Sequence, residues 1–182
     1  MKTNKSIFMC VAIVAMSIMS CGSKKAGEMD HSGHDMSMEK EKTTEMQAST
    51  LPKNKAQEII SAYLALKDAL VQTDGTLASE SAKSLASVAE GSEEVASKIK
   101  ASADQIAGTI DAEEQRKIFS TLSDDVYSLV KSTDANDETL YLQYCPMAFD
   151  NTGASWLSAE KEVLNPYFGD KMLKCGSVKE EL

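Results

Sequence analysis

The chain has 182 residues, of which 19 are Lys or Arg and 28 are Asp or Glu, so its formal net charge is -9. This acidic balance argues against nucleic acid as a partner, because a phosphate backbone is bound through basic surfaces. It is consistent with an extracytoplasmic protein that attracts cations, although most such carboxylates only solvate exposed helix faces.

Residues 1–20 are predicted to be a secretory signal peptide. Two lysines precede an apolar run over residues 7–18, which is too short to span a bilayer. The run ends in Ile18-Met19-Ser20-Cys21, which resembles the bacterial lipobox, where the cysteine is diacylated and becomes the new N-terminus. The resemblance implies a lipoprotein held at a bacterial membrane through Cys21, and we expect the outer membrane, facing the periplasm. An ordinary signal peptide with an incidental cysteine is the alternative.

Residues 21–50 are predicted to be a flexible tether, because they are poor in bulky apolar residues and rich in Lys, Glu, Ser, Thr, Gly and Met. A secondary metal site is predicted inside this tether, where both histidines of the chain and three methionines fall within ten residues. Thioethers suit Cu(I), and imidazoles suit Cu(II). The candidate ligands are Met29, His31, His34, Met36 and Met38. A tether with a chance composition is the alternative.

Residues 51–182 are predicted to form one mainly α domain. Apolar residues recur at steps of three and four over four stretches, which is the period of an amphipathic helix. The stripes are Ile59, Tyr63, Leu66 and Leu70; Leu77, Leu85 and Val88; Val95, Ile99, Ala103, Ile106 and Ile110; and Ile118, Leu122, Val126 and Leu129. Breaks at residues 74–75 and 91–92 and a capping-box spacing at Asp111 to Glu114 separate them. The short connections predict an up-down four-helix bundle.

A C-terminal hairpin or loop unit over about residues 139–178 is predicted to cover the bundle. Residues 140–144 indicate a short strand, and residues 150–153 indicate a turn. Residues 154–157 are predicted to lead into a helical turn that Ser158 caps. The unit holds the only tryptophan of the chain and several other aromatic residues, which such a closure would bury.

Soft metal ligands are segregated along the mature chain. Met, Cys and His are absent from residues 47–144, and they return in Cys145-Pro146-Met147 and then at Met172 and Cys175. Proline fixes the backbone between the first two donors, and Met172 and Cys175 have the spacing of one helical face. Two thiolates and two thioethers suit Cu(I) or Ag(I) and suit Zn(II) poorly. We therefore predict a metal site formed by Cys145, Met147, Met172 and Cys175.

A disulfide between Cys145 and Cys175 is the alternative interpretation of the same residues. In an oxidising compartment, two lone cysteines usually pair. The bridge would close a loop of about thirty residues and contribute on the order of 3 kcal/mol. The same two cysteines could also alternate between a bridge and metal ligands with the redox state.

Three stretches of the C-terminal unit, Tyr144 to Met147, Trp156 to Ser158 and Asn165 to Gly176, resemble a bacterial family called domain-of-unknown-function family three-three-four-seven. The resemblance extends over the helical region from about residue 54. Members of this family occur as lipoproteins and as domains attached to periplasmic adaptors of copper and silver efflux systems. The resemblance implies metal handling outside the cytoplasm, with an efflux adaptor as a candidate partner.

The resemblance carries the four sulfur ligands over position by position. It also implies that the loop presenting Met172 and Cys175 is built by Asn165, Tyr167, Gly169 and Asp170. In short heavy-metal-binding domains the Cys-Pro-Met element is followed by His-Pro, whereas Ala148-Phe149 follows here. An imidazole ligand beside Met147 is therefore not expected.

The sequence thus predicts an extracytoplasmic lipoprotein that binds Cu(I) or Ag(I) in copper homeostasis or efflux. We do not expect an enzyme, because residues 51–182 hold no histidine, no glycine-rich phosphate loop and no nucleophile with an evident base. The alternative is a structural or interaction lipoprotein in which the disulfide staples the C-terminal unit as a lid, and which docks onto a transport complex.

Overall fold

The computed structural model describes residues 51–133, 135 and 137–182, and these residues belong to one compact unit. The predicted signal peptide, the lipidated Cys21 and the predicted tail ligands between residues 29 and 38 lie outside the described residues. In the described part of the chain, no helix is both long enough and apolar enough to cross a membrane.

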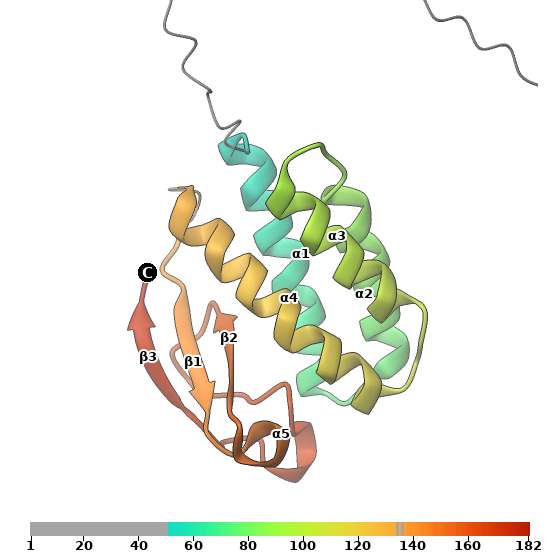
Figure 1. Ribbon diagram of the computed structural model, residues 1–182. Coiled ribbons are helices and arrows are strands. Elements are labelled where there is room, and N and C mark those ends of the chain that lie inside the picture. Colours follow the sequence, from blue (N-terminus) through green and yellow to red (C-terminus); the bar gives the residue numbers. More distant parts are fainter. Residues whose placement is uncertain (1–50, 134, 136) are drawn as a thin grey trace, which may run out of the picture. The chain divides into compact units, whose positions relative to one another are not determined.

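Four long helices make up most of the described residues: α1 (Lys53–Val71), α2 (Gly75–Val88), α3 (Glu94–Ala107) and α4 (Ala112–Ser132). Each helix runs back along the one before it, and α4 also contacts α1 (Figure 1). The prediction of a mainly helical protein with four amphipathic helices is confirmed. The helices end close to the predicted breaks, because Asp74 and Gly75 start α2 and residues 91–93 precede α3.

Aspartate side chains begin two of these helices. Asp74 and Asp111 each accept a hydrogen bond, at 2.9 Å, from a backbone N–H group in the first turn of the following helix. Those N–H groups have no partner inside the helix, so the caps stabilise both starts. The start at Asp111 agrees with the prediction. The capping box is not closed as its spacing predicts, because Glu114 accepts a hydrogen bond from the Thr109 hydroxyl instead.

The core between the helices combines the predicted stripes with small residues. Fully buried alanines on three of the helices are Ala56, Ala69, Ala78, Ala82, Ala96 and Ala103. Side chains of this size let helix backbones approach closely. Two stripe residues were predicted wrongly. Ile110 is 70% exposed, because α3 already ends at Ala107 and Ile110 lies in the following connection, and Leu77 of α2 is 40% exposed.

The C-terminal segment, residues 139–182, contains a small antiparallel sheet in which β1 (Tyr141–Cys145) lies between β2 (Ala154–Ser158) and β3 (Ser177–Glu181). The strand predicted at residues 140–144 is confirmed, and β3 is an addition to the predicted hairpin. The helical turn predicted after Ser158 is wrong. Ser158 ends β2, and its hydroxyl accepts a hydrogen bond from the N–H of Glu160 at 3.1 Å, which forms a bend.

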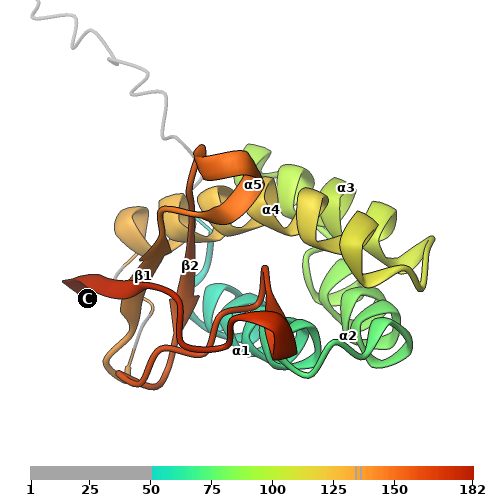
Figure 2. The same ribbon diagram turned by 90° about the horizontal axis from the view of Figure 1, so that it is seen from below.

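The sheet lies between α4 and the long loop, which is residues 159–176. Strand β2 packs against α4, as both ribbon views show (Figures 1 and 2). Side chains alternate between the two faces of a strand, so Gln143 and its cross-strand partner Trp156 share the face that the long loop covers. Both are fully buried, and the Trp156 ring lies edge-on to Tyr167 of the long loop at 5.8 Å.

Candidate metal centre

A left-handed turn connects β1 to β2 directly after the Cys-Pro-Met sequence. The short element α5 (Ala148–Asn151) contains three consecutive residues with positive φ, namely Phe149, Asp150 and Asn151 at 50°, 56° and 69°. Left-handed backbone costs roughly 1–2 kcal/mol per L-residue, so packing outside the turn must hold it. The Phe149 ring lies edge-on to Tyr167 with ring centroids 5.3 Å apart. The turn places the start of β2, at Ala154, opposite Cys145.

Asn165 fixes the part of the long loop that carries the second pair of predicted ligands. Its side chain is fully buried, and its Nδ2 donates a hydrogen bond to the carbonyl of Cys175 at 2.7 Å. Its Oδ1 accepts from the N–H groups of Tyr167 at 2.8 Å and Phe168 at 3.3 Å. Its own N–H donates to the carbonyl of Leu173. A single amide therefore sets the course of the loop on both sides of Cys175.

Met172 and Cys175 belong to a hydrogen-bonded turn and not to a regular helix. The 3₁₀ helix η1 (Gly169–Lys171) ends before Met172, and the N–H of Cys175 then donates to the carbonyl of Met172 at 3.1 Å. Met172 and Cys175 therefore share one hydrogen-bonded turn, and not the face of a helix that their spacing predicted. The chain continues through Gly176, whose φ of 144° and close contact with Trp156 leave no room for a Cβ atom.

Arg116 of α4 joins the long loop to the helices. Its guanidinium is 2% exposed and donates to the carbonyls of Pro166 at 2.8 Å and Leu70 at 3.1 Å. It also donates to the Thr73 hydroxyl at 3.0 Å and pairs with the more exposed Glu113. The α1 end and the long loop thus share one buried cation. Sequence reasoning missed this residue, although Arg116 is the only arginine among 19 basic residues.

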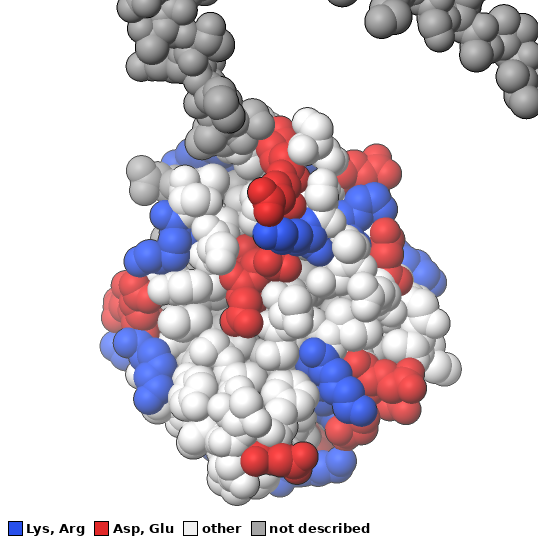
Figure 3. Space-filling view, in the orientation of Figure 1, with Lys and Arg blue, Asp and Glu red and all other residues white. Residues whose placement is uncertain are grey.

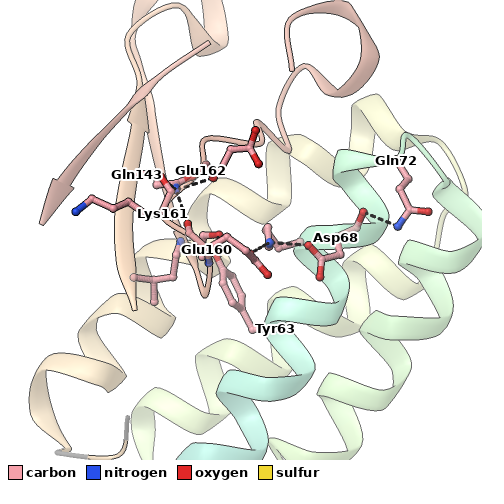
Figure 4. A network of polar contacts seen from close by, with 10 residues as sticks. Tyr63, Asp68, Gln72, Gln143, Glu160, Lys161 and Glu162 are labelled. Carbon is pink, nitrogen blue, oxygen red and sulfur yellow. Dashed lines mark hydrogen bonds and ion pairs between the residues drawn. The ribbon is translucent and has the colours of Figure 1, made fainter. Parts of the chain in front are cut away.

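A second polar network fixes the beginning of the long loop (Figure 4). Lys67 of α1 is 1% exposed and forms ion pairs with Asp68 and with Glu160 of the loop. From the sheet, Gln143 Nε2 donates to three successive carbonyls of residues 160–162 at 2.9 to 3.4 Å. The hydrogen bond from Ser158 is the main cause that lowers the pKa of the Glu160 carboxyl, and the positive charge of Lys67 lowers it further. Sequence reasoning did not single out Lys67 or Gln143.

The two cysteines lie in direct contact. Their Sγ atoms are 3.0 Å apart although the residues are 30 positions apart in the chain. A disulfide bond is about 2.05 Å long, and two sulfurs on one tetrahedral ion with bonds of about 2.3 Å lie about 3.8 Å apart. The observed distance between the two sulfurs lies between the length of a disulfide bond and the separation of two sulfurs on one metal ion. The hydrogen bond with Cys145, followed by burial, raises the pKa of the Cys175 thiol.

The two methionines line a common hollow of about 440 Å³ at the α5 end of the sheet. Met147 is 47% exposed, and Met172 is half-buried. Asp150, Asn151 and Glu113 line the same hollow, and so do the basic residues Arg116, Lys117 and Lys171, of which Arg116 and Lys171 pair with Glu113. The face seen in Figure 3 is mostly uncharged around α5 and carries basic and acidic side chains at the border of that area.

The structure therefore brings the predicted ligands together as two pairs. The cysteine sulfurs are in contact, and the methionines share the hollow, but neither cysteine is among the residues that line it. Within residues 51–182 as described, no group of three or more His, Cys, Asp or Glu side chains is arranged to hold a metal ion.

The fold is thus that of a four-helix protein whose C-terminal segment carries all its sulfur within the described residues. Residues 59–138 match the model of a family described as "Protein of unknown function (DUF3347)". The matched family is the one that the resemblance in the sequence indicated, and the match spans less than half of the chain. It covers the helices and ends before β1, so it does not reach the sulfur-bearing segment. No curated protein and no solved structure matches the chain.

Proposed function

We propose that this protein is an extracytoplasmic lipoprotein that binds Cu(I) or Ag(I) through the sulfur atoms of its C-terminal segment, in copper homeostasis or efflux. One observation carries the proposal. The fold brings Cys145 and Cys175 into contact at 3.0 Å and places Met147 and Met172 on one hollow, although the two sulfur-bearing stretches are far apart in the sequence. Thiolate and thioether are the donors that soft monovalent ions prefer.

The surroundings of the sulfurs support this chemistry. Cys145 is fully buried at the end of β1, and the loop that carries Cys175 is fixed by Asn165. Such fixed surroundings orient ligands and increase metal affinity. An ion bound tetrahedrally by both thiolates requires the sulfurs to separate from 3.0 Å to nearly 4 Å, and Cys175 is the partly exposed member of the pair. A thioether from the neighbouring hollow would then complete the coordination.

A Cu(I) titration tests the proposal. The reduced mature protein is titrated with Cu(I) against a chromophoric competitor, beside the variants Cys145→Ser, Cys175→Ser and Met147→Leu/Met172→Leu. Leucine matches methionine closely in volume, so the double variant removes both thioethers with little change in packing. We expect one high-affinity Cu(I) site that either serine variant weakens by about a hundredfold or more. Unchanged affinity in both serine variants would sink the proposal.

The predicted tail site needs a separate control. The wild-type protein and each variant are therefore also prepared with the five candidate metal ligands of the tail replaced, namely Met29, His31, His34, Met36 and Met38. If the proposal holds, these replacements remove any weaker second equivalent and leave the C-terminal site unchanged. Loss of the strong site in the tail variant, with no effect of Cys145→Ser, would place copper binding in the tail instead.

Membrane attachment and partner are further parts of the proposal. The lipobox-like sequence before Cys21 supports a lipid anchor, and labelling with an alkyne fatty acid tests it, since Cys21→Ser should abolish the label. The resemblance discussed above supports an efflux adaptor as the partner that receives the ion. Copper-dependent cross-linking to such an adaptor in the periplasm is expected, and it should be absent in Cys145→Ser.

A second candidate function is a structural or interaction lipoprotein with a disulfide-stapled lid that docks onto a transport complex. The 3.0 Å contact between Cys145 and Cys175 favours it, and the raised pKa of the Cys175 thiol disfavours the thiolate that a metal ligand requires. Intact mass spectrometry of protein taken from the periplasm decides between the two. A deficit of two hydrogens, together with no Cu(I) affinity after reduction, would establish the stapled lid.

A further inference from the structure

The thiol pair of the C-terminal segment is asymmetric. Cys145 is fully buried at the end of β1, whereas Cys175 lies in a turn of the long loop and is partly exposed. A reagent from solution therefore reaches Cys175 first. The second sulfur is already 3.0 Å away, so a sulfur oxidised at Cys175 has its partner in direct contact and needs to approach it by only about 1 Å to form a disulfide.

The neighbouring hollow offers two kinds of donor. Asp150 and Asn151 line it with oxygen-bearing side chains and Met147 and Met172 with thioethers, whereas Glu113 is ion-paired with Arg116 and Lys171. Oxygen donors accept Cu(II), whereas thioethers stabilise Cu(I). A copper ion that enters as Cu(II) would therefore be held more strongly after it gains an electron. Met147 follows Cys145 by two positions and Met172 precedes Cys175 by three, so each thioether lies close to one of the thiols along the chain.

We propose that the reduced Cys145 and Cys175 pair reduces Cu(II) to Cu(I) and is itself converted to an intramolecular disulfide. The inference rests on the proposed function and adds an activity to it. Two Cu(II) ions and two thiols give two Cu(I) ions, one S–S bond and two protons, which are released to solvent. Each copper gains one electron, and each sulfur loses one.

The order of events follows from the exposure of the two thiols. Cu(II) binds the Cys175 sulfur as its proton leaves, and one electron passes to the ion. The Cys145 thiol loses its proton to solvent, the resulting thiolate bonds to the Cys175 sulfur radical, and the bonded pair passes its extra electron to the second Cu(II). The first Cu(I) passes to the thioethers of Met147 and Met172, which the oxidised protein retains as ligands.

The test uses the mature chain with Cys21→Ala, so that Cys145 and Cys175 are its only thiols, and with His31→Ala and His34→Ala, so that the tail does not compete for Cu(II). The reduced protein receives excess Cu(II) without oxygen, and a chromophoric chelator records Cu(I). We expect two Cu(I) per chain, loss of both thiols, a mass deficit of two hydrogens, and a rate constant that does not depend on protein concentration.

Matched variants separate this activity from ordinary thiol oxidation. In Cys145→Ser the remaining thiol can form only a bridge between two chains, so the yield should fall twofold, to one Cu(I) per chain, and the rate should depend on protein concentration. The double variant Met147→Leu/Met172→Leu should keep the full yield but react about tenfold more slowly, because the thioethers no longer stabilise Cu(I).

The outcomes distinguish this inference from the proposed function. A yield equal to wild type in Cys145→Ser, or Cu(II) bound without the appearance of Cu(I), would overturn the inference. If the reduced protein binds Cu(I) directly and yet fails to reduce Cu(II), only the inference fails. If it reduces Cu(II) within one chain but shows no Cu(I) affinity, the reductive activity stands and the proposed metal-binding function fails.

Discussion

The helices and the C-terminal segment are stabilised in different ways. The helices have apolar stripes, aspartate caps and alanine contacts, all of which are repeated along the sequence. The C-terminal segment depends on a few single side chains that hydrogen-bond to distant backbone carbonyls, chiefly Arg116, Asn165 and Gln143. Repeated small contributions tolerate the loss of one member, whereas a unique buried hydrogen-bonding group does not. Substitutions should therefore act unequally in the two regions.

The largest effect is expected for Arg116→Met. This substitution leaves the carbonyls of Pro166 and Leu70 buried without their donor, and it should lower the free energy of unfolding by about 3 kcal/mol. Urea denaturation measures the change. The neighbouring exposed Lys117 provides the matched control, since Lys117→Met removes the same charge and should change stability by less than about 0.5 kcal/mol. Equal effects of the two variants would contradict the role given to Arg116.

Asn165→Ala is expected to cost about 2 kcal/mol, because it leaves the Cys175 carbonyl and the N–H of Tyr167 without partners. It should also weaken Cu(I) binding, since the loop that carries Cys175 loses its fixed course. Asn165→Asp keeps the acceptor oxygen but places a buried carboxylate oxygen against the Cys175 carbonyl oxygen, so it should be at least as harmful as alanine. Denaturation and Cu(I) competition on the same samples check both effects, and unchanged Cu(I) affinity in Asn165→Ala would count against a positioning role.

A pair of glycine substitutions compares the two regions directly. Gly169 has a φ of 51°, and a Cβ atom there would lie 2.2 Å from the Thr73 hydroxyl and 2.6 Å from the Arg116 guanidinium. Gly169→Ala should therefore destabilise the protein by about 1–2 kcal/mol. Gly108, at the end of α3, has right-handed backbone with a φ of -76°, so Gly108→Ala should have almost no effect. Thermal unfolding measures the stability of both variants. A larger loss of stability in Gly108→Ala than in Gly169→Ala would contradict the comparison.

The last predicted effect is a pH dependence of Cu(I) binding that is confined to the C-terminal segment. A metal ion must displace the thiol proton, and the raised pKa of the Cys175 thiol keeps that proton bound to higher pH. The apparent Cu(I) affinity should therefore increase by about tenfold per pH unit for each proton displaced, and it should still be increasing at the ordinary thiol pKa. Helix content over the same range should stay constant. A pH-independent affinity would show that the thiols are not ligands.

The helices could be predicted from the sequence because their signals are local. Stripes at steps of three and four, together with Asp74 and Asp111, located all four, and Ile110 was misplaced only because the stripe continued past the helix end. The strand at residues 141–145 was found for the same local reason. The contact between Cys145 and Cys175 was anticipated from residue type alone, by either the bridge or the metal interpretation.

The rest of the C-terminal segment could not be predicted, because distant contacts determine it. Ser158 has the composition of a helix cap, but pairing of β2 with β1 keeps it in a strand. Strand β3 has charged residues on an edge and no apolar alternation, so nothing local indicates it. The division of the ligands into a thiol pair and a thioether pair follows from the left-handed turn at Phe149, a residue type that gives no such signal.

That left-handed turn has a consequence for the stereochemistry of the chain. At Asp150 and Asn151 the backbone adopts the mirror image of helical geometry, and both side chains are exposed. D-amino acids favour this conformation as strongly as L-amino acids disfavour it. Chemical ligation could therefore introduce D-Asp and D-Asn at these two positions, and the inverted residues would relieve strain next to Met147 while leaving every sulfur atom in place. In this turn, the natural chirality of the chain opposes the fold that it forms.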